Sequence, residues 1–317
     1  MTDINAARIK AKALELGFDL CGIAPASDYS ELKFFREWID RGYAGDMTYL
    51  NRSADRRADV RNVIESARSV IVTATVYNTN RPYSTECKDP SMAHIARYAW
   101  GDDYHDVIGE RMERLLEWMR STSDTPFDAR AYVDTGPVQE RVYAQYAGIG
   151  WIGKNTCVIN AEKGSWIFLA EIICSLELEF DRPAFDQCGT CTLCIEACPT
   201  KAIVAPGVVD SNRCISYLTI EHRGDIPEEF REAIGTHIYG CDICQEVCPW
   251  NTTPAVSNDP AWQPREVWDG AVVEELADRS DDDLRTAMRG SAMRRTKVAG
   301  LRRNLVVSRH AIGVVDD

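Results

Sequence analysis

The chain has 317 residues, 12 of them cysteine, and a formal net charge of -13 at pH 7. This length is sufficient for two or three domains, and a hydrophobic content of 45% predicts a sizeable core. The acidic balance excludes loose binding of nucleic acid over the whole surface, so a polyanionic partner requires a local basic patch. No apolar run approaches the roughly 20 residues that span a bilayer, and residues 1–4 do not begin a signal peptide. Together with the clustered thiols described below, this predicts a cytoplasmic protein that does not bind membranes.

The first quarter of the chain predicts two helices and two strands. Residues 3–17 have helical periodicity, residues 18–23 form a short strand, and residues 31–40 form a second helix. A basic loop follows before the buried-strand pattern of residues 70–74, and its arginines are Arg52, Arg56, Arg57 and Arg61. Two interpretations of these arginines stay open: a solvated helix face for at least two of them, or anion binding, because guanidinium groups match phosphate and carboxylate.

The middle of the chain predicts a helix, a strand that ends on an acid, and a glycine-spaced loop. The long helix after His105 has an apolar stripe of Ile108, Met112, Leu115 and Met119, which predicts core packing. Residues 131–134 read as a strand that ends on Asp134, and residues 138–147 as the next helix, with Pro137 near its first turn. Residues 148–156 match neither a Walker loop nor a dinucleotide fingerprint, so we expect their glycines to admit a large flat ligand. Residues 156–176 predict a hairpin that turns at Lys163 and Gly164.

A domain boundary is expected near residues 181–183, and eight cysteines follow it in two sets. The first set ends at Pro199 and has the C-x2-C-x2-C-x3-C-P spacing of bacterial ferredoxins, whose fourth cysteine binds the other cluster of a pair. The second set is looser and ends at Pro249. We therefore predict two 4Fe-4S clusters, one on Cys188, Cys191, Cys194 and Cys248 and the other on Cys198, Cys214, Cys241 and Cys244.

Two alternatives for these cysteines fit their spacing less well. Zinc sites usually consist of C-x2-C pairs that are a dozen or more residues apart, and zinc stays a minor alternative. A disulfide framework is typical of small secreted domains, which this chain does not resemble.

The last third of the chain predicts helices and a basic segment. Residues 215–223 and 227–234 read as helical inserts between Cys214 and Cys241, and residues 272–276 and 283–288 as short helices. The basic segment is a solvated face or a polyanion contact, and its residues are Arg285, Arg289, Arg294, Arg295, Lys297, Arg302, Arg303 and Arg309.

Several of these segments resemble the epoxyqueuosine reductase family. They are ARY at 96–98, DYH at 103–105, YVDTGPV at 132–138, GIGWIGKN at 148–155, SYLTIEHRG at 216–224 and IYGCDICQEVCPWN at 238–251. The resemblance covers nearly all of residues 1–253 and weakens afterwards, where family members often carry a longer helical-repeat region.

The resemblance implies an α+β fold with three parts. These are a nitroreductase-like, cobalamin-binding catalytic domain (residues 1–180), a ferredoxin-like domain with two 4Fe-4S clusters (181–253) and a short, helical, basic C-terminal region (254–317). It implies reduction of epoxyqueuosine to queuosine at the wobble position of tRNA, with electrons from an external one-electron donor and a protein that acts as a monomer. The nearest approach to the cobalamin motif D-x-H-x-x-G begins at Asp103 and misses by one residue, which argues against histidine ligation of cobalt.

The resemblance also implies the roles of individual residues. Asp134 is the expected acid that protonates the opened epoxide, provided that burial raises its pKa towards neutrality. The expected cobalamin contacts are Arg57, Arg97, Asp134, Asn155, Ser216 and Tyr217, and the expected tRNA contacts are Lys154, His222 and Arg223. A reductive dehalogenase and a plain iron–sulfur electron carrier remain alternative functions, although the first is typically exported and the second leaves residues 1–180 unexplained.

Overall fold

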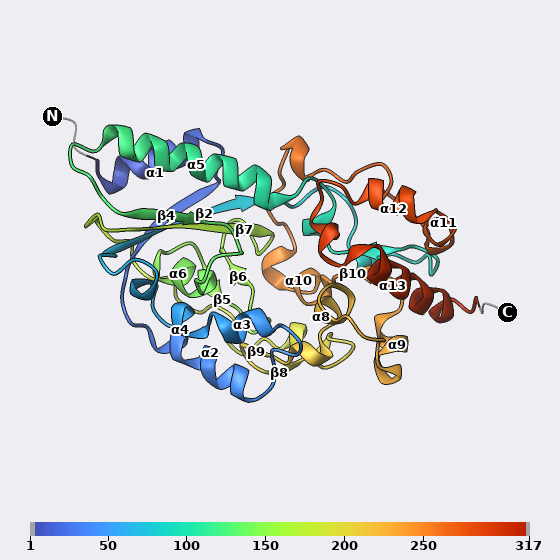
Figure 1. The fold of residues 1–317 in the computed structure, drawn as a ribbon. Coiled ribbons are helices and arrows are strands. Elements are labelled where there is room, and N and C mark those ends of the chain that lie inside the picture. Colours follow the sequence, from blue (N-terminus) through green and yellow to red (C-terminus); the bar gives the residue numbers. More distant parts are fainter. Residues whose placement is uncertain (1–3, 315–317) are drawn as a thin grey trace.

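The computed structural model describes residues 4–314 and has a four-stranded antiparallel sheet at its centre, in the order β1-β2-β7-β4 (Figure 1). The strands are β1 (Leu20–Pro25), β2 (Ser69–Val76), β7 (Ile167–Cys174) and β4 (Ala129–Tyr132). Every residue of β2 is buried, as its apolar run predicted. Antiparallel strands with helices packed on both faces confirm the predicted α+β fold.

One core lies between the sheet and the helices α1 (Ala6–Glu15) and α5 (Tyr104–Thr122), which cover the upper face of the sheet in Figure 1. The predicted stripe of α5 is buried, with no member more than 1% exposed, and consists of Ile108, Met112, Leu115 and Met119. Burial of each such side chain contributes about 1.5–3 kcal/mol. The side chain of Asn5 accepts a hydrogen bond from the backbone N–H of Arg8 at 3.0 Å and begins α1, whereas residue 3, the predicted start, lies outside the described residues.

The opposite face of the sheet is covered by α6 (Glu140–Tyr146), whose buried side chains pack on β1, β2 and β7. The helix is shorter than the predicted range 138–147 because Gln139 is its N-cap, and Pro137 precedes it. Similarly, β4 ends at Tyr132, so Asp134 lies in the turn after the strand and does not end it. These shifts place residues 133–139 in an irregular segment between the strand and the helix.

The basic segment that was predicted as a loop is helical. After α2 (Ser30–Asp40), the chain forms α3 (Thr48–Arg52) and α4 (Ala54–Arg57). Three of its arginines are exposed, namely Arg52, Arg56 and Arg61, so the solvated-face interpretation holds for them. Arg57 is half-buried, and its Nη1 atom donates to the carbonyl oxygen of Val138 at 2.7 Å, which joins α4 to the segment before α6.

The predicted hairpin over residues 156–176 is wrong. The strand β6 (Val158–Ile159) pairs with β5 (Trp151–Ile152), whereas β7 pairs with β2 and β4. Only a single bridge between Asn160 and Gly164 closes the turn. As an inner strand, β7 forms hydrogen bonds to distant strands on both edges, and local alternation does not reveal such pairing.

The glycines of residues 148–156 serve internal packing. A Cβ atom at Gly150 would lie 2.3 Å from the carbonyl oxygen of Ile159, and one at Gly148 would lie 2.7 Å from that of Arg182. Such distances are far shorter than van der Waals contact. These glycines therefore bring the chain's own backbone segments together, and the expected contact with a large flat ligand stays a prediction.

The cysteine-rich segment is a compact module that joins the sheet domain through a second small sheet. Its strand β10 (His237–Tyr239) pairs in parallel with β3 (His94–Ile95). The predicted inserts are present as α8 (Ile215–Ile220) and α9 (Glu228–Ile234). The remaining elements are α7 (Leu193–Glu196), β8 (Ile203–Ala205), β9 (Val208–Val209) and α10 (Ile243–Glu246).

The C-terminal region forms α11 (Val273–Ala277), α12 (Asp281–Ala287) and α13 (Lys297–Ala311), which lie beside β10 in Figure 1. The helix α13 was not predicted. It buries Leu301 and Leu305, and the buried Asn304 donates to the carbonyl oxygens of Thr219 and Ile238, both at 2.8 Å. Much of the predicted basic segment is thus a structural helix of the core.

Short 3-10 turns connect these elements. They are η1 (Val60–Asn62), η2 (Ser84–Glu86), η3 (Arg97–Ala99), η4 (Ser211–Arg213), η5 (Pro249–Asn251), η6 (Pro260–Trp262) and η7 (Ala292–Arg295). Among residues 4–314, none of the helices has the length and apolar character that crossing a membrane requires.

Candidate active site and cluster-binding module

The neighbouring thiols in the structure follow the two predicted sets of cysteines, and the assignment of the cluster ligands stays a prediction. Burial, together with the neighbouring thiols of Cys248, Cys188 and Cys191, raises the pKa of Cys194 to about 11. In the second group, Cys214 has Cys198 as its thiol neighbour, and Cys241 has Cys214. Cys244 forms a hydrogen bond with Cys157, a cysteine outside both predicted sets, and also interacts with Cys241 and Cys214. Each predicted set supplies four thiols, the number that one cubane 4Fe-4S cluster binds. When a cluster binds, its irons would replace the thiol protons.

The first group lies nearer to solvent than the second. The loop that carries Cys188, Cys191 and Cys194 has exposed residues at 187, 189, 190, 192 and 193. The residues beside Cys241 and Cys244 are buried instead, at 240, 242 and 245. The first group is therefore the more accessible of the two from solvent.

Asp134 lies beyond the end of β4 and faces the first turn of α5. It has a left-handed backbone with φ of 55°, an uncommon conformation for a residue with a side chain. Its Oδ2 atom lies 3.4 Å from Nε2 of His105, and Oδ1 of Asp103 lies 2.7 Å from Nδ1 of the same ring. The carboxyl side chain is 59% exposed, so a ligand has access to it.

The pKa of Asp134 differs from the expectation, which was a raised value. Burial lowers the pKa of His105, but hydrogen bonds to Asp103 and Asp134 outweigh it and raise the pKa to about 9. Desolvation by the surrounding protein raises the pKa of Asp134, but the hydrogen bond from His105 prevails and holds that pKa below its usual value. The expectation of a raised pKa for Asp134 is wrong: at neutral pH the proton resides on His105.

Two further carboxyl groups lie close to Asp134. Burial, followed by the negative charge of Asp134, raises the pKa of Glu140 at the start of α6 to about 8. Burial, with Glu140 and Asp134, raises the pKa of Glu171 well above its usual value. Glu171 is fully buried, and neither of its carboxyl oxygens has a hydrogen-bond partner. Both glutamates therefore carry protons at neutral pH.

Arg57, which like Asp134 was predicted to contact cobalamin, lies near Glu140 and Glu171. Its positive charge lowers the pKa of both Glu140 and Glu171. The sequence interpretation did not assign His105, Glu140 or Glu171 to the site. A signal for Glu171 was present, because it is the only charged residue in the strand sequence IFLAEIIC. The residues that surround Glu171 in the fold, Glu140, Asp134 and Arg57, could not be identified from the sequence.

Lys154 and Asn155 face the cysteine module. Nζ of Lys154 donates to the carbonyl oxygens of Gly189 at 2.7 Å and Cys191 at 2.8 Å. Nδ2 of Asn155 donates to the carbonyl oxygen of Cys244 at 3.1 Å. These side chains hold one loop of each thiol group, and their predicted contacts with tRNA and cobalamin stay predictions.

Arg97 is buried apart from the Asp134 group. Its guanidinium group donates to the carbonyl oxygens of Thr79, Arg81 and Pro82 at 3.0–3.1 Å and lies over the ring of Trp100. These contacts give Arg97 a structural role, and we do not propose it further as a cofactor contact.

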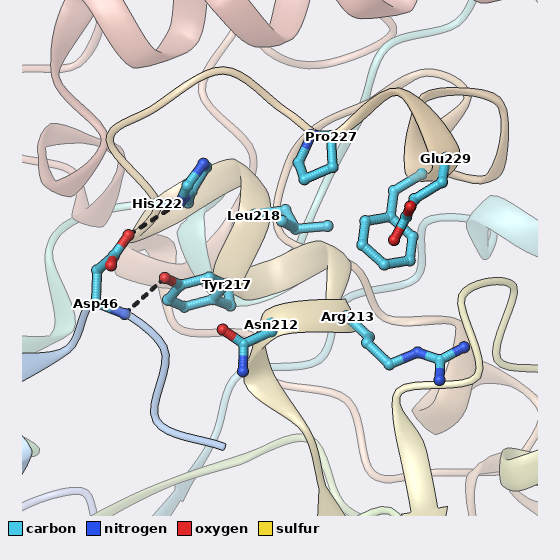
Figure 2. A pocket seen from close by; sticks show the side chains of 9 residues that line it. Asp46, Asn212, Arg213, Tyr217, Leu218, His222, Pro227 and Glu229 are labelled. Carbon is cyan, nitrogen blue, oxygen red and sulfur yellow. Dashed lines mark hydrogen bonds and ion pairs between the residues drawn. The ribbon is translucent and has the colours of Figure 1, made fainter. Parts of the chain in front are cut away.

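A separate cavity of about 530 Å³ lies between the segment before α3 and the cysteine module (Figure 2). The backbone N–H of Asp46 donates to the hydroxyl of Tyr217 at 2.8 Å, and Oδ2 of Asp46 lies 3.1 Å from Nδ1 of His222. The cavity lining is Asp46, Asn212, Arg213, Tyr217, Leu218, His222, Pro227, Glu229 and Phe230. It brings together two predicted residues, one for cobalamin and one for tRNA.

The remaining predicted contacts are Ser216, which lies in α8, and Arg223, which follows that helix. The hydroxyl of Ser216 donates weakly to the carbonyl oxygen of Cys241 at 3.5 Å. Arg223 donates to the carbonyl oxygens of Arg295 and Thr296 at 2.9 and 3.2 Å, so it joins the module to the C-terminal region.

Two thiol groups and a proton-carrying carboxyl group on an α+β scaffold define an iron–sulfur oxidoreductase. A family model described as "4Fe-4S double cluster binding domain" matches residues 187–251, and one described as "Epoxyqueuosine reductase QueG, DUF1730" matches residues 57–135. The chain is 43% identical to epoxyqueuosine reductase of Gloeobacter violaceus, over 99% of this chain and 97% of that protein. It is 40% identical to that of Xanthomonas campestris, over 95% and 85%. The chain belongs to the epoxyqueuosine reductase family.

Solved structures of relatives agree with this assignment. An epoxyqueuosine reductase bound to an epoxyqueuosine-modified tRNA-Tyr stem loop is 29% identical, with a TM-score of 0.86 over 96% of this chain and 80% of that one. An epoxyqueuosine reductase from Bacillus subtilis, with its catalytic loop swung out of the active site, is 27% identical, with a TM-score of 0.86 over 98% and 82%.

Proposed function

We propose that this protein reduces epoxyqueuosine to queuosine at the wobble position of tRNA, as the last step of queuosine synthesis. The observation that carries the proposal is the near-full-length match to curated epoxyqueuosine reductases. In this reaction the epoxide loses its oxygen, two electrons and two protons are consumed, and a cyclopentene and water are formed. The protein must therefore supply electrons singly from its clusters and protons at the leaving oxygen.

Asp134 is the proposed catalytic residue, since its carboxyl group is exposed and adjoins a charged proton donor. At neutral pH, His105 holds a proton that its Nε2 atom presents to Asp134, while Asp103 fixes the other ring nitrogen. Asp134 relays this proton to the oxygen as the carbon–oxygen bond breaks, because an alkoxide is a poor leaving group. Glu140 holds a second proton nearby, which matches the stoichiometry of the reaction.

Cobalamin is the proposed second cofactor, and when bound it supplies a reduced cobalt centre that transfers electrons to the epoxide carbon. The side chains around Asp134 are compatible with it in chemistry. Oε1 of Glu140 is a buried acceptor without a hydrogen-bond partner, and amide groups like those of a corrin ring donate to such atoms. We propose Arg57, Ser216 and Tyr217 as further contacts of the cofactor. Asn155 would act indirectly, because it holds the Cys244 loop.

The proposed tRNA contacts lie on the module and the C-terminal region. His222 lines the cavity of Figure 2, and Arg223 adjoins Arg295, which lies over the ring of Tyr49 and pairs with Glu221. Phosphate contacts by such residues make binding dependent on salt. We further propose that the protein acts as a monomer and takes its electrons from an external one-electron donor.

The test is a defined reaction. Anaerobically reconstituted protein is incubated with dithionite, cobalamin and epoxyqueuosine-containing tRNA, and the nucleosides are analysed by mass spectrometry. We expect queuosine to form only when both cofactors are present. Absence of queuosine from protein that contains eight irons and bound cobalamin would overturn the proposal.

A further inference from the structure

Trp151 reaches from the sheet domain to a cysteine sulfur. It lies in β5, is 1% exposed, and its indole Nε1–H donates to Sγ of Cys188 at 3.4 Å. The indole is held from the other side by Trp250, in an edge-to-face contact with ring centroids 4.9 Å apart. Since Trp250 follows Cys248 by two residues, Trp151 contacts one proposed ligand of the first cluster and a residue that lies near another in the chain.

The neighbouring Lys154 strengthens this attachment. Its ammonium group donates to the carbonyl oxygens of Gly189 and Cys191, within the same loop. Residues 151–154 therefore place one neutral donor on a sulfur ligand and one positive charge beside it. In the second thiol group, Sγ of Cys198 accepts from the backbone N–H of Ala202 at 3.2 Å and lies 3.8 Å from the hydroxyl of Thr200.

Reduction of a 4Fe-4S cluster with four thiolate ligands adds one electron and thus one negative charge. A hydrogen bond to a ligating sulfur stabilises the more negative state, so it raises the reduction potential of the cluster. We propose that Trp151 is a positioning residue that raises the potential of the first cluster. This favours transfer of one electron from a reduced one-electron carrier protein, which is oxidised, to the cluster nearest the surface.

The inference rests on the ligand assignment of Cys188 within the proposed function, but not on epoxide chemistry. Its test is therefore independent of tRNA. Cluster-loaded wild type and Trp151→Phe are titrated with dithionite and followed by electron paramagnetic resonance. We expect the midpoint potential of one cluster to become more negative in Trp151→Phe, while that of the other cluster stays unchanged.

Trp38→Phe is a matched control, because the indole N–H of Trp38 also crosses to the cysteine module but donates to the carbonyl oxygen of Val209 at 2.7 Å. It should leave both potentials unchanged. Two unchanged potentials in fully loaded Trp151→Phe would overturn the proposal.

A second measurement covers the case in which Trp151→Phe does not load its clusters. Wild-type protein is labelled with ¹⁵N in the indole rings of tryptophan, and pulsed resonance spectra of the reduced clusters are recorded. An indole nitrogen coupled to one cluster upholds the contact, and absence of any such coupling overturns it.

Discussion

Nε2 of His105 lies 3.4 Å from Oδ2 of Asp134, and this contact joins the first turn of α5 to the turn after β4. Because Asp103 binds the other ring nitrogen, the imidazole ring is held between two carboxylates and stays charged at neutral pH. At neutral pH the proton donor of this site is therefore charged His105, paired with ionised Asp134, and not a lone protonated aspartate.

Asp134→Asn is expected to retain both clusters and cobalamin but to lower turnover by about 10²–10⁴-fold, the usual contribution of a positioned proton donor. The measurement is queuosine formation under saturating reductant. Asp128→Asn is the control, because Asp128 lies before the same strand but accepts from Ser66, away from the site. Near-normal turnover by Asp134→Asn would remove the residue from this role.

His105→Gln is expected to lose stability in a pH-dependent way. The folded-state pKa of His105 is raised from 6.5 to about 9, so its contribution to stability is complete below pH 6.5 and is lost as the pH rises to about 9. Urea unfolding from pH 6 to 9.5 should show a difference between wild type and variant that shrinks with rising pH. A difference that does not vary with pH would contradict the proposed charge on His105.

Glu140→Gln is expected to change stability in the same pH direction, but over a lower pH range. Burial and Asp134 raise the pKa of Glu140 from 4.5 to about 8, so the wild type loses stability as the pH rises from 4.5 through 8. The neutral glutamine lacks this loss, and the variant should gain stability relative to wild type up to pH 8 and then reach a plateau. The same unfolding series measures it, and a variant that is less stable at pH 8 than at pH 6, relative to wild type, would refute the assignment.

Arg294→Gln is expected to weaken binding of the anticodon stem loop and to reduce the salt slope by about 1, the effect of one lost phosphate contact. Arg294 is exposed on η7, and its charge lowers the pKa of Asp103, which places it at the edge of the Asp134 group. Arg285→Gln is the control, because Arg285 pairs with Asp282 on α12. Equal salt slopes for wild type and Arg294→Gln would exclude this contact.

Short-range spacing accounts for what could be predicted. The stripe of α5 and the buried run of β2 are patterns within single segments, and each was found as expected. The cysteine spacing is also a local pattern, and a double-cluster family model matches its segment, residues 187–251. The family resemblance likewise rests on contiguous residues. It directed attention to Asp134 and Arg57, which the structure places in one group.

Long-range pairing accounts for what could not be predicted. The partners of β7 are strands some hundred residues earlier and some forty residues earlier in the chain, so residues 156–176 resembled a hairpin that does not form. Lys154 was expected to contact tRNA, and only the structure shows that its ammonium group donates to two carbonyl groups about 35 residues away.

The sequence by itself determined the cluster ligands that we propose, the fold class and the family, because these depend on residue type and local spacing. Only the tertiary structure decided where the protons reside. The pKa values of Asp134, Glu140 and His105 depend on burial and on charges brought together from separate elements, and neither quantity exists until the chain has folded.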